Sequence, residues 1–343
     1  MSGDDVIYGG DGNDYMYGGG GYDIMFGGAG DDTYWFADGI GEAYEDADGG
    51  NDTVWIDIGD WTLGEHFENL AGWSGTNVLA GNASSNYIAG ASGDDVISGM
   101  EGDDFLYGDS WNFGFGDSGI DGNDWIDGGR GSDTIHGEGG DDQLFGGAGF
   151  DMLDGGDDND TLTGGGMKDT MLGGAGNDSL FGNNGHDEMF GGDGRDFLKG
   201  GVGNDLMDGG ADNDDLRGGS GKDTLFGGAG QDMLRGDDGA DTFAWLEGDF
   251  AGMDGAGADR ILDFDRGDGD QIDLSAIDAI FGDEDDAFTF VGSDDFSGTA
   301  GELRYEFAEG YTMVYMHVDG DAAADFAIRL DGTLNLLASD FVL

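Results

Sequence analysis

Aspartate is the residue in this chain whose number and spacing could do chemistry. Residues 128–244 consist of thirteen consecutive nine-residue units with the frame G-G-x-G-x-D-x-U-x, where U is apolar. The sixth residue is Asp in every unit, and the eighth is always hydrophobic. Carboxylates held at a fixed interval in tight turns are hard oxygen ligands, the type that Ca²⁺ prefers. The repeat therefore predicts a series of calcium sites.

The glycines and apolar residues define the elements that must hold these aspartates. Gly at places 1, 2 and 4 permits the positive φ of a tight turn, and the x-U-x that follows is a short strand. One unit cannot bury its apolar residue, so units must stack into parallel sheets around a ladder of Leu, Met and Ile. With two units per coil, each Asp lies over the Asp eighteen residues later, at a coil spacing of about 4.8 Å. Bare carboxylates at that spacing repel, so a cation between adjacent turns is expected.

The frame resembles the RTX nonapeptide, the hemolysin-type calcium-binding repeat, and that resemblance implies a Ca²⁺-loaded parallel β-roll. We therefore expect an all-β fold, a parallel β-solenoid with a β-rich C-terminal cap. Some units depart from the frame, and these turns are expected to be weaker sites. Place 4 is Asp158, Met167 and Asp212 instead of Gly, and place 2 is Glu138, Asn183 and Asp237.

The predicted metal ligands are the sixth-place aspartates of the array and of the shorter runs that precede it. They are expected to hold multiple Ca²⁺ ions, roughly ten or more. The predicted ligands are Asp5, Asp14, Asp23, Asp32, Asp95, Asp104, Asp124, Asp133, Asp142, Asp151, Asp160, Asp169, Asp178, Asp187, Asp196, Asp205, Asp214, Asp223, Asp232 and Asp241.

The composition supports metal binding by aspartate and argues against several other classes of protein. The formal net charge is −65, with 64 Asp against 12 Glu, and a short carboxylate held in its own turn explains this skew better than general surface charge does. Only 11 Lys and Arg are present, which argues against nucleic-acid binding. There is no Cys and no Pro, so thiol chemistry and slow prolyl isomerisation do not enter. No apolar run approaches membrane-spanning length.

The pattern divides the chain into four segments. Residues 1–35 carry N-terminal repeats, and their first coil has no visible cap, so it could pair with another copy in a homo-oligomer. Residues 36–80 lose the strict frame and are expected to continue the solenoid without most of the calcium sites; a small independent domain is the alternative. Residues 81–244 form the main roll, interrupted by an insertion at 108–118. Its aromatic residues could bind a partner or could fold back over the roll: Trp111, Phe113 and Phe115.

Residues 245–343 resemble the C-terminal domain of serralysin-type metalloproteases, which caps the roll in that family. The last residues, Asp340-Phe341-Val342-Leu343, resemble the acidic and hydrophobic tail of proteins exported by the type I secretion apparatus. The resemblance implies a secreted protein, extracellular or at the cell surface. Related chains carry a calcium loop near the end, but here it reads H-V-D-G-D-A-A-A-D over 317–325, so we expect no calcium there.

Catalytic motifs are not found. The four His residues lie at 66, 136, 186 and 317, and none occurs in the H-E-x-x-H context of a zinc protease. No G-x-S-x-G elbow is present, and Gly221-Lys222 is followed by Asp instead of Ser or Thr. We therefore expect a non-enzymatic, structural or self-assembling calcium-binding protein that folds on extracellular Ca²⁺. The alternative is a detached targeting or secretion module of an extracellular hydrolase, protease or polysaccharide epimerase.

Overall fold

The computed structural model describes residues 3–47, 49–109, 121–249, 257–280, 286–319 and 323–343. The chain divides into two compact units, 1–173 and 174–343, and the boundary falls inside β18 (Thr170–Ala175). The boundary lies within the array that the sequence assigns to one segment. Nearly all of the regular structure in the described ranges is β-strand, and none of the helices found there is long and apolar enough to cross a membrane.

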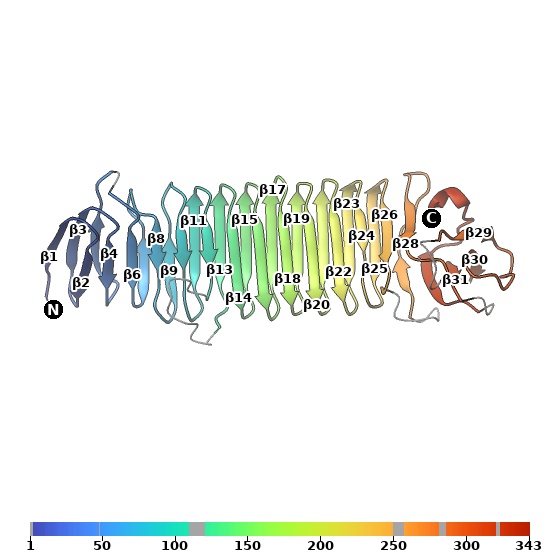
Figure 1. Cartoon of the computed structure of the whole chain (residues 1–343), viewed down its shortest axis with the longest axis horizontal. Coiled ribbons are helices and arrows are strands. Elements are labelled where there is room, and N and C mark those ends of the chain that lie inside the picture. Colours follow the sequence, from blue (N-terminus) through green and yellow to red (C-terminus); the bar gives the residue numbers. More distant parts are fainter. Residues whose placement is uncertain (1–2, 48, 110–120, 250–256, 281–285, 320–322) are drawn as a thin grey trace. The chain divides into compact units, whose positions relative to one another are not determined.

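Unit 1 is a parallel β-solenoid in which alternate strands enter two facing sheets (Figure 1). Partner residues are one coil apart along the chain, as in the pairing of Ile126 with Leu144. One sheet contains, in order, β2 (Tyr15–Gly19), β4 (Thr33–Phe36), β6 (Thr53–Ile56), β8 (Asn69–Ala71), β10 (Tyr87–Ala89), β12 (Phe105–Tyr107), β14 (Thr134–Gly139) and β16 (Met152–Asp157). The other contains β7 (Gly59–Thr62), β9 (Asn77–Ala80), β11 (Val96–Glu101), β13 (Trp125–Arg130), β15 (Gln143–Ala148) and β17 (Thr161–Gly166).

The second sheet of unit 1, which begins with β7, does not extend to the N-terminal coils. A separate three-stranded sheet is formed by β1 (Val6–Asp11), β3 (Asp23–Ala29) and β5 (Gly41–Tyr44), and β5 does not pair with β7. The first sheet, which begins with β2, is continuous there, because β4 pairs with β6 and β6 pairs with β8. Residues 36–80 thus continue the solenoid in the first sheet and interrupt it in the second.

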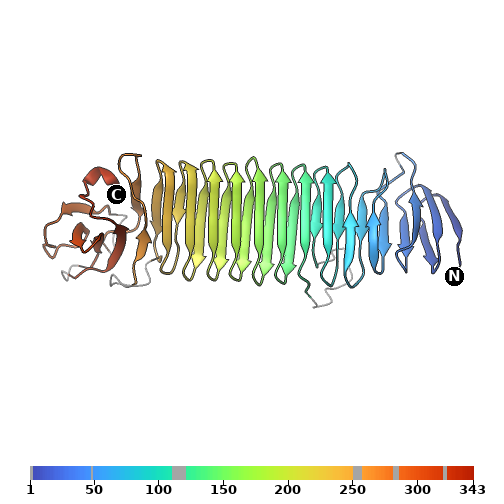
Figure 2. The ribbon, with the colours of Figure 1, turned by 180° about the vertical axis from the view of Figure 1, so that it is seen from behind.

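Unit 2 has the same kind of parallel arrangement within itself, and its C-terminal part adds two antiparallel strand pairings (Figure 2). One sheet contains β20 (Glu188–Asp193), β22 (Leu206–Ala211), β24 (Thr224–Phe226), β26 (Thr242–Leu246), β28 (Gln271–Ala276) and β33 (Phe341–Val342). The other contains β19 (Ser179–Asn184), β21 (Phe197–Val202), β23 (Asp215–Gly221), β25 (Met233–Gly239), β27 (Asp259–Ile261), β32 (Phe326–Asp331), β31 (Tyr311–His317), β30 (Glu302–Ala308) and β29 (Thr289–Gly292). The solenoid therefore extends past residue 244, to β27 and β28.

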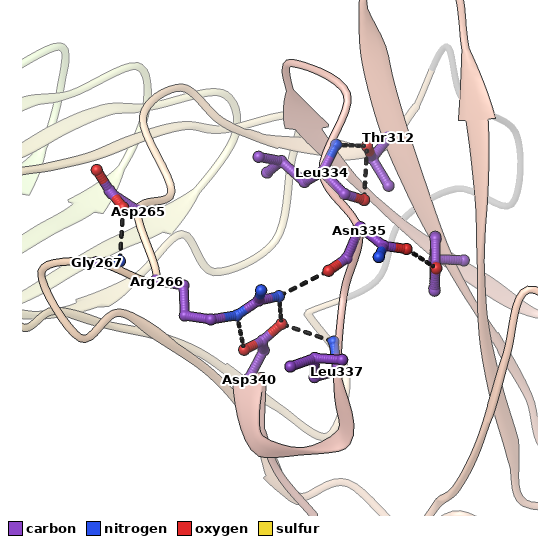
Figure 3. Close-up of polar contacts among 9 residues, drawn as sticks. Asp265, Arg266, Gly267, Thr312, Leu334, Asn335, Leu337 and Asp340 are labelled. Atoms are coloured by element: carbon purple, nitrogen blue, oxygen red, sulfur yellow. Dashed lines mark hydrogen bonds and ion pairs between the residues drawn. The ribbon is translucent and has the colours of Figure 1, made fainter.

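The C-terminal residues cover the last coil of unit 2. β32 pairs with β27, and the two-residue strand β33 pairs with β28, so both final edges have a partner. The 3₁₀ turn Ala338–Asp340 leads into β33, and Arg266 forms an ion pair there with the buried carboxylate of Asp340 (Figure 3). The same guanidinium donates a 2.8 Å hydrogen bond to the Asn335 carbonyl oxygen. These contacts confirm the expected β-rich cap.

The apolar ladder forms the core of both units. Every eighth-place residue from Ile135 to Phe243 is fully buried. Glycine is needed at place 1 because there is no room for a Cβ. An ideal Cβ on Gly128 would lie 2.5 Å from Asp133 Oδ2 and 2.8 Å from the Gly146 carbonyl oxygen. Real Cβ contacts are longer, so a side chain there would displace the aspartate.

The six residues that replace glycine at places 2 and 4 all keep the left-handed backbone of the turn. Non-glycine residues pay a steric cost there, of about 1–2 kcal/mol each. The turn geometry therefore persists where the sequence frame fails. The residues are Glu138 (φ 79°), Asp158 (77°), Met167 (85°), Asn183 (69°), Asp212 (72°) and Asp237 (63°).

Candidate metal centre

The turns place the sixth-residue aspartates inside the protein. Of the twenty predicted ligands, eighteen are at most 3% exposed; only Asp5 and Asp14, in the first coil, are half-buried. Each Asp directly precedes a strand, or in the case of Asp23 begins one, so the strand register fixes its position over the next coil. The structure therefore brings the predicted ligands together in two rows, one before the strands of each sheet.

One oxygen of each carboxylate joins adjacent coils. In the regular turns, Oδ1 accepts a hydrogen bond from the backbone N–H of the aspartate one coil earlier, as Asp142 does from Asp124 at 2.7 Å. Sequence reasoning did not foresee that this oxygen is used by the backbone. Within unit 1 the bonds join Asp5 to Asp23, Asp14 to Asp32, Asp95 to Asp124, Asp104 to Asp133, Asp124 to Asp142, Asp133 to Asp151, Asp142 to Asp160 and Asp151 to Asp169. Within unit 2 they join Asp178 to Asp196, Asp187 to Asp205, Asp196 to Asp214, Asp205 to Asp223, Asp214 to Asp232 and Asp223 to Asp241.

The second oxygen of these carboxylates is buried and has no hydrogen-bond donor. A buried polar atom without a partner costs about 1–3 kcal/mol, and more when the group is charged. A chain that repeated this cost at every turn would not fold unless something else satisfied the oxygens. The Oδ2 atoms in this state include those of Asp14, Asp23, Asp32, Asp95, Asp104, Asp124, Asp133, Asp142, Asp151, Asp196, Asp205, Asp214, Asp223, Asp232 and Asp241.

Burial and mutual repulsion raise the pKa values of these carboxyl groups. Burial, followed by the charges of neighbouring aspartates, raises the pKa of Asp142 to about 8. The pKa values of Asp124, Asp214 and Asp223 rise to about 7, chiefly because of burial. Without a counter-ion, part of each row would therefore be protonated at neutral pH.

The donor set fits a hard cation. Many turns offer a carboxylate Oδ2 beside a glycine carbonyl oxygen of the next coil, as Asp133 and Gly146 do next to Gly128. All of these ligands are oxygens, the set that Ca²⁺ and Mg²⁺ take, and Ca²⁺ accepts the larger and less regular cages. Cationic side chains are not available to most of unit 1, because residues 1–129 contain 27 Asp and Glu and no Lys or Arg.

The rows contain members that the eighteen-residue spacing did not predict. The N–H of Asp232 donates to Asp259 Oδ1 at 3.0 Å, and that of Asp241 donates to Asp270 Oδ1 at 3.1 Å. These partners are 27 and 29 residues apart in sequence, because a loop is inserted between them. Asp52 likewise accepts from the N–H of Asp32 at 2.7 Å, across twenty residues. Only the strand register, which a nine-residue frame cannot supply across insertions, identifies them.

Two places in the rows are occupied by amides instead of carboxylates. Asn77 Nδ2 donates to the Gly90 carbonyl oxygen at 3.1 Å, and Asn86 Nδ2 donates to the Phe67 carbonyl oxygen at 3.1 Å. Beside Gly72, the Asn77 N–H donor thus meets the glycine carbonyl oxygen of the next coil, where regular turns present a carboxylate oxygen. Beside Gly81, Asn86 Oδ1 lies next to the Gly99 carbonyl oxygen, and its N–H donor is used by Phe67. Asn77 lies in the segment 36–80, where the sequence predicted fewer calcium sites, whereas Asn86 lies in the predicted main roll.

The insertion after the twelfth strand begins one residue later than predicted. Gly108 holds the first-place position beside Asp124 Oδ2 and the Gly137 carbonyl oxygen, so it belongs to the repeat and not to the insertion. The aromatic residues predicted there as a partner site, Trp111, Phe113 and Phe115, lie outside the described residues.

The segment 317–325 brings three possible ligands together, although the sequence predicted no calcium there. Ligand atoms of His317, Asp319 and Asp325 lie within 4.8 Å of one another. Two of the side chains already have hydrogen-bond partners: His317 Nδ1 lies 3.1 Å from the Thr299 carbonyl oxygen, and Asp325 Oδ2 accepts from the Val318 N–H at 2.7 Å. The absence of calcium there stays a prediction.

The comparisons with known proteins agree with this donor set. The model of the RTX calcium-binding nonapeptide repeat (4 copies) matches residues 1–40, 71–110 and 118–243 in overlapping segments, more than half of the chain. The chain belongs to the RTX calcium-binding nonapeptide repeat family. Its cofactor is therefore Ca²⁺. In the part of the chain that the family model covers, the buried carboxylate rows are the groups that would hold the ions.

Comparison with solved structures finds a partial match. The solution structure of the AlgE6R3 subunit from the Azotobacter vinelandii mannuronan C5-epimerase is similar at 28% identity, covering 55% of this chain and 80% of that chain, with a TM-score of 0.29. No curated protein matches the chain.

Proposed function

We propose that this RTX protein is a non-enzymatic calcium-binding module that is exported unfolded and folds outside the cell when it meets millimolar Ca²⁺. The observation that carries the proposal is the pair of buried rows whose Oδ2 atoms lack donors. A fold that buries uncompensated carboxylates is unstable until a cation binds. Calcium concentration then decides whether the fold exists.

The magnitudes support a calcium-controlled switch. A site with a Kd of about 10⁻⁴ M, the tight end for extracellular modules, stabilises the folded state by about 1.4 kcal/mol at 1 mM Ca²⁺. Roughly ten such sites contribute about 14 kcal/mol, comparable with the 5–15 kcal/mol total stability of an ordinary domain. At cytosolic, sub-micromolar calcium the contribution is near zero.

The C-terminal tail supports recognition before folding. We propose that the serralysin-like segment 245–343 and its last four residues are read by a type I secretion apparatus. In the folded chain, Asp340 is buried against Arg266, and Phe341–Val342 pairs with β28. An export apparatus that reads an extended tail therefore needs the unfolded form, which low calcium maintains.

Circular dichroism of the full chain tests the calcium switch. The far-UV spectrum is expected to be β-rich in 5 mM CaCl₂, a concentration chosen well above the Kd of about 10⁻⁴ M, and largely disordered in chelator. Mg²⁺ at equal ionic strength is the control, because a chain of charge −65 also responds to screening. A β-rich spectrum that persists in chelator, or that Mg²⁺ restores equally well, would refute the proposal.

A further inference from the structure

Three carboxylates come together where the regular repeats give way to an irregular coil. Asp32 lies in the residues that the family model matches, whereas Glu45 and Asp52 lie outside them. Oxygen atoms of Asp32, Glu45 and Asp52 lie within 4.8 Å of one another, all in unit 1. Asp32 is the sixth residue of a regular repeat, and Asp52 is its partner in the row, one coil later. Glu45 follows directly after β5, in the longer loop of that coil.

Glu45 occupies the position that a backbone carbonyl has in the regular turns. Beside Gly9, the nearest oxygens to an ideal Cβ are Asp14 Oδ2 and the Gly27 carbonyl oxygen, both at 2.8 Å. Beside Gly27, the corresponding oxygens are Asp32 Oδ2, Glu45 Oε1 and the Tyr34 hydroxyl. At this turn a charged side-chain oxygen therefore lies where the turn beside Gly9 has a neutral carbonyl oxygen.

Two of the three carboxylates are buried with an oxygen that has no donor. Asp52 is 0% exposed and Asp32 is 1% exposed, and the Oδ2 atom of each lacks a hydrogen-bond partner. Their Oδ1 atoms are used by the backbone N–H groups of Asp32 and Asp14. Because residues 1–129 contain no Lys or Arg, no cationic side chain of that segment other than a histidine can compensate them.

The third carboxylate is held toward the other two. The Tyr34 hydroxyl is within hydrogen-bond distance of Glu45 Oε1 and, at 3.0 Å, of the Tyr44 carbonyl oxygen. The Gly28 N–H donates to Glu45 Oε2 at 3.3 Å. Tyr34 is itself fully buried at the eighth place of its repeat, where other repeats have Leu or Met. It is a positioning residue, which fixes Glu45 without bringing a charge.

We propose that Asp32, Glu45 and Asp52 together bind one hard divalent cation of the Ca²⁺ type, in a coil that departs from the nonapeptide frame. Three carboxylates carry one more negative charge than a site built from two aspartates and carbonyls, and ligand charge is one of the factors that set calcium affinity. The site does not depend on export or on folding outside the cell, so it can be tested apart from the proposed function.

Ion counting on the folded chain gives the first test. Glu45→Gln keeps the shape of the side chain and an oxygen that accepts from Tyr34, but it removes the charge. The matched control is Glu42→Gln, in the same coil, whose carboxylate accepts from the Tyr22 and Tyr44 hydroxyls instead. After equilibration with Ca²⁺ and removal of free ion, E45Q is expected to hold one ion fewer per chain than the wild type, and E42Q the same number. An unchanged count in E45Q would overturn the site.

Anomalous scattering on the wild-type chain gives a test that needs no variant. Crystals grown with Tb³⁺ in place of Ca²⁺ are expected to show a peak among Asp32, Glu45 and Asp52. Peaks at regular turns of the array serve as the internal control for ion substitution. Peaks at those turns with none at this cluster would overturn the proposal, even if E45Q failed to fold.

Discussion

The backbone N–H of Asp133 donates a 2.9 Å hydrogen bond to Oδ1 of Asp151, one coil further along, while Oδ2 of Asp151 is buried without a donor. One carboxylate therefore has two separate roles. Its first oxygen joins the coils through the backbone, and its second is available to bind a cation. The two roles can be separated by substitution.

Asp151→Asn keeps the oxygen that accepts from Asp133 and removes the charge of the second. In Ca²⁺ the variant is expected to bind one ion fewer and to lose about 1.4 kcal/mol of stability, the contribution of one site at ten times its Kd. In chelator at neutral pH it is expected to be no less stable than the wild type, because one buried charge is gone. Denaturant unfolding with and without Ca²⁺ measures both effects. Asp157→Asn, at an exposed third-place position, is the control and should change neither.

Low pH is expected to stabilise the folded chain when no calcium is bound. Burial raises the folded-state pKa values of Asp124 and Asp223 to about 7 and that of Asp142 to about 8, whereas an unfolded Asp titrates near 4. A raised carboxyl pKa means that the folded chain binds more protons than the unfolded chain. The associated stability is complete below about pH 4 and is lost as the pH rises through about 7–8.

Circular dichroism of metal-free protein from pH 8 to pH 4 measures this effect. The β signal is expected to grow as the pH falls, and Ca²⁺ binding near pH 7 is expected to release protons into a weakly buffered solution. A β signal that stays constant or declines as the pH falls over that range would contradict the raised pKa values of these carboxyl groups. The calcium-loaded protein is the control, since ligand binding should hold its carboxyl groups ionised across most of the range.

Met167→Gly is expected to stabilise the calcium-loaded protein. Met167 has φ 85° at a turn position where the frame has Gly, and its side chain is 54% exposed, so little packing is lost. Relief of the left-handed conformation is worth about 1 kcal/mol. Met233→Gly, at an exposed strand position, is the matched control and should destabilise by about 0.5–1 kcal/mol. Equal destabilisation by both substitutions in thermal unfolding would show that the turn is not strained.

Arg266→Gln is expected to loosen the C-terminal cap. Asp340 is 1% exposed and the Arg266 side chain is 45% exposed, so the loss should lie between those of a surface and a buried ion pair, at about 1–2 kcal/mol in excess Ca²⁺. Arg130→Gln removes the same group from an exposed pair with Glu101 and should cost less than about 0.5 kcal/mol. Amide hydrogen exchange of Phe341 and Val342 is expected to become faster in the Arg266 variant alone, which would show that the C-terminal cap has loosened. Equal exchange rates in the two variants would contradict this prediction.

The nine-residue frame predicts much of this structure because every part of it has one physical role. Gly128 leaves the space that a Cβ would fill, Asp133 faces that space, and Ile135 enters the core, so the solenoid and its metal ligands follow from one unit. The frame fails where an insertion changes the spacing, which is why Asp52, Asp259 and Asp270 could not be predicted. Their places depend on strand register, and register is set by pairing with residues of the coil before.

The irregular coils also contain residues that the repeat frame cannot predict. Glu45 reaches the row from a loop with no repeat pattern, so no spacing rule connects it with Asp32. The break between β5 and β7 falls where the nine-residue frame is lost, but the loss of the frame does not indicate which of the two sheets is interrupted. In contrast, Asn86 stands at a sixth place of the frame, and its amide indicates a coil built without a carboxylate.

Asn86→Asp is expected to convert that coil into an additional calcium site. Asn86 is 3% exposed, its Nδ2 donates to the Phe67 carbonyl oxygen, and its Oδ1 accepts from the Asn82 N–H at 2.8 Å. The substitution replaces the donor with a carboxylate oxygen, so two acceptors meet where a donor met an acceptor. Without Ca²⁺ this should cost about 1–3 kcal/mol, the penalty of an unsatisfied buried group.

With Ca²⁺, a cation can satisfy both oxygens, and the variant is expected to bind one ion more than the wild type and to recover most of that loss. Ion counting and denaturant unfolding in each condition measure the two effects. Asn123→Asp, at an exposed fifth place, makes the same chemical change away from the row and should leave the ion count unchanged. An Asn86 variant that is destabilised equally with and without Ca²⁺ would mean that a carboxylate beside the Gly99 carbonyl oxygen is not sufficient to form a calcium site.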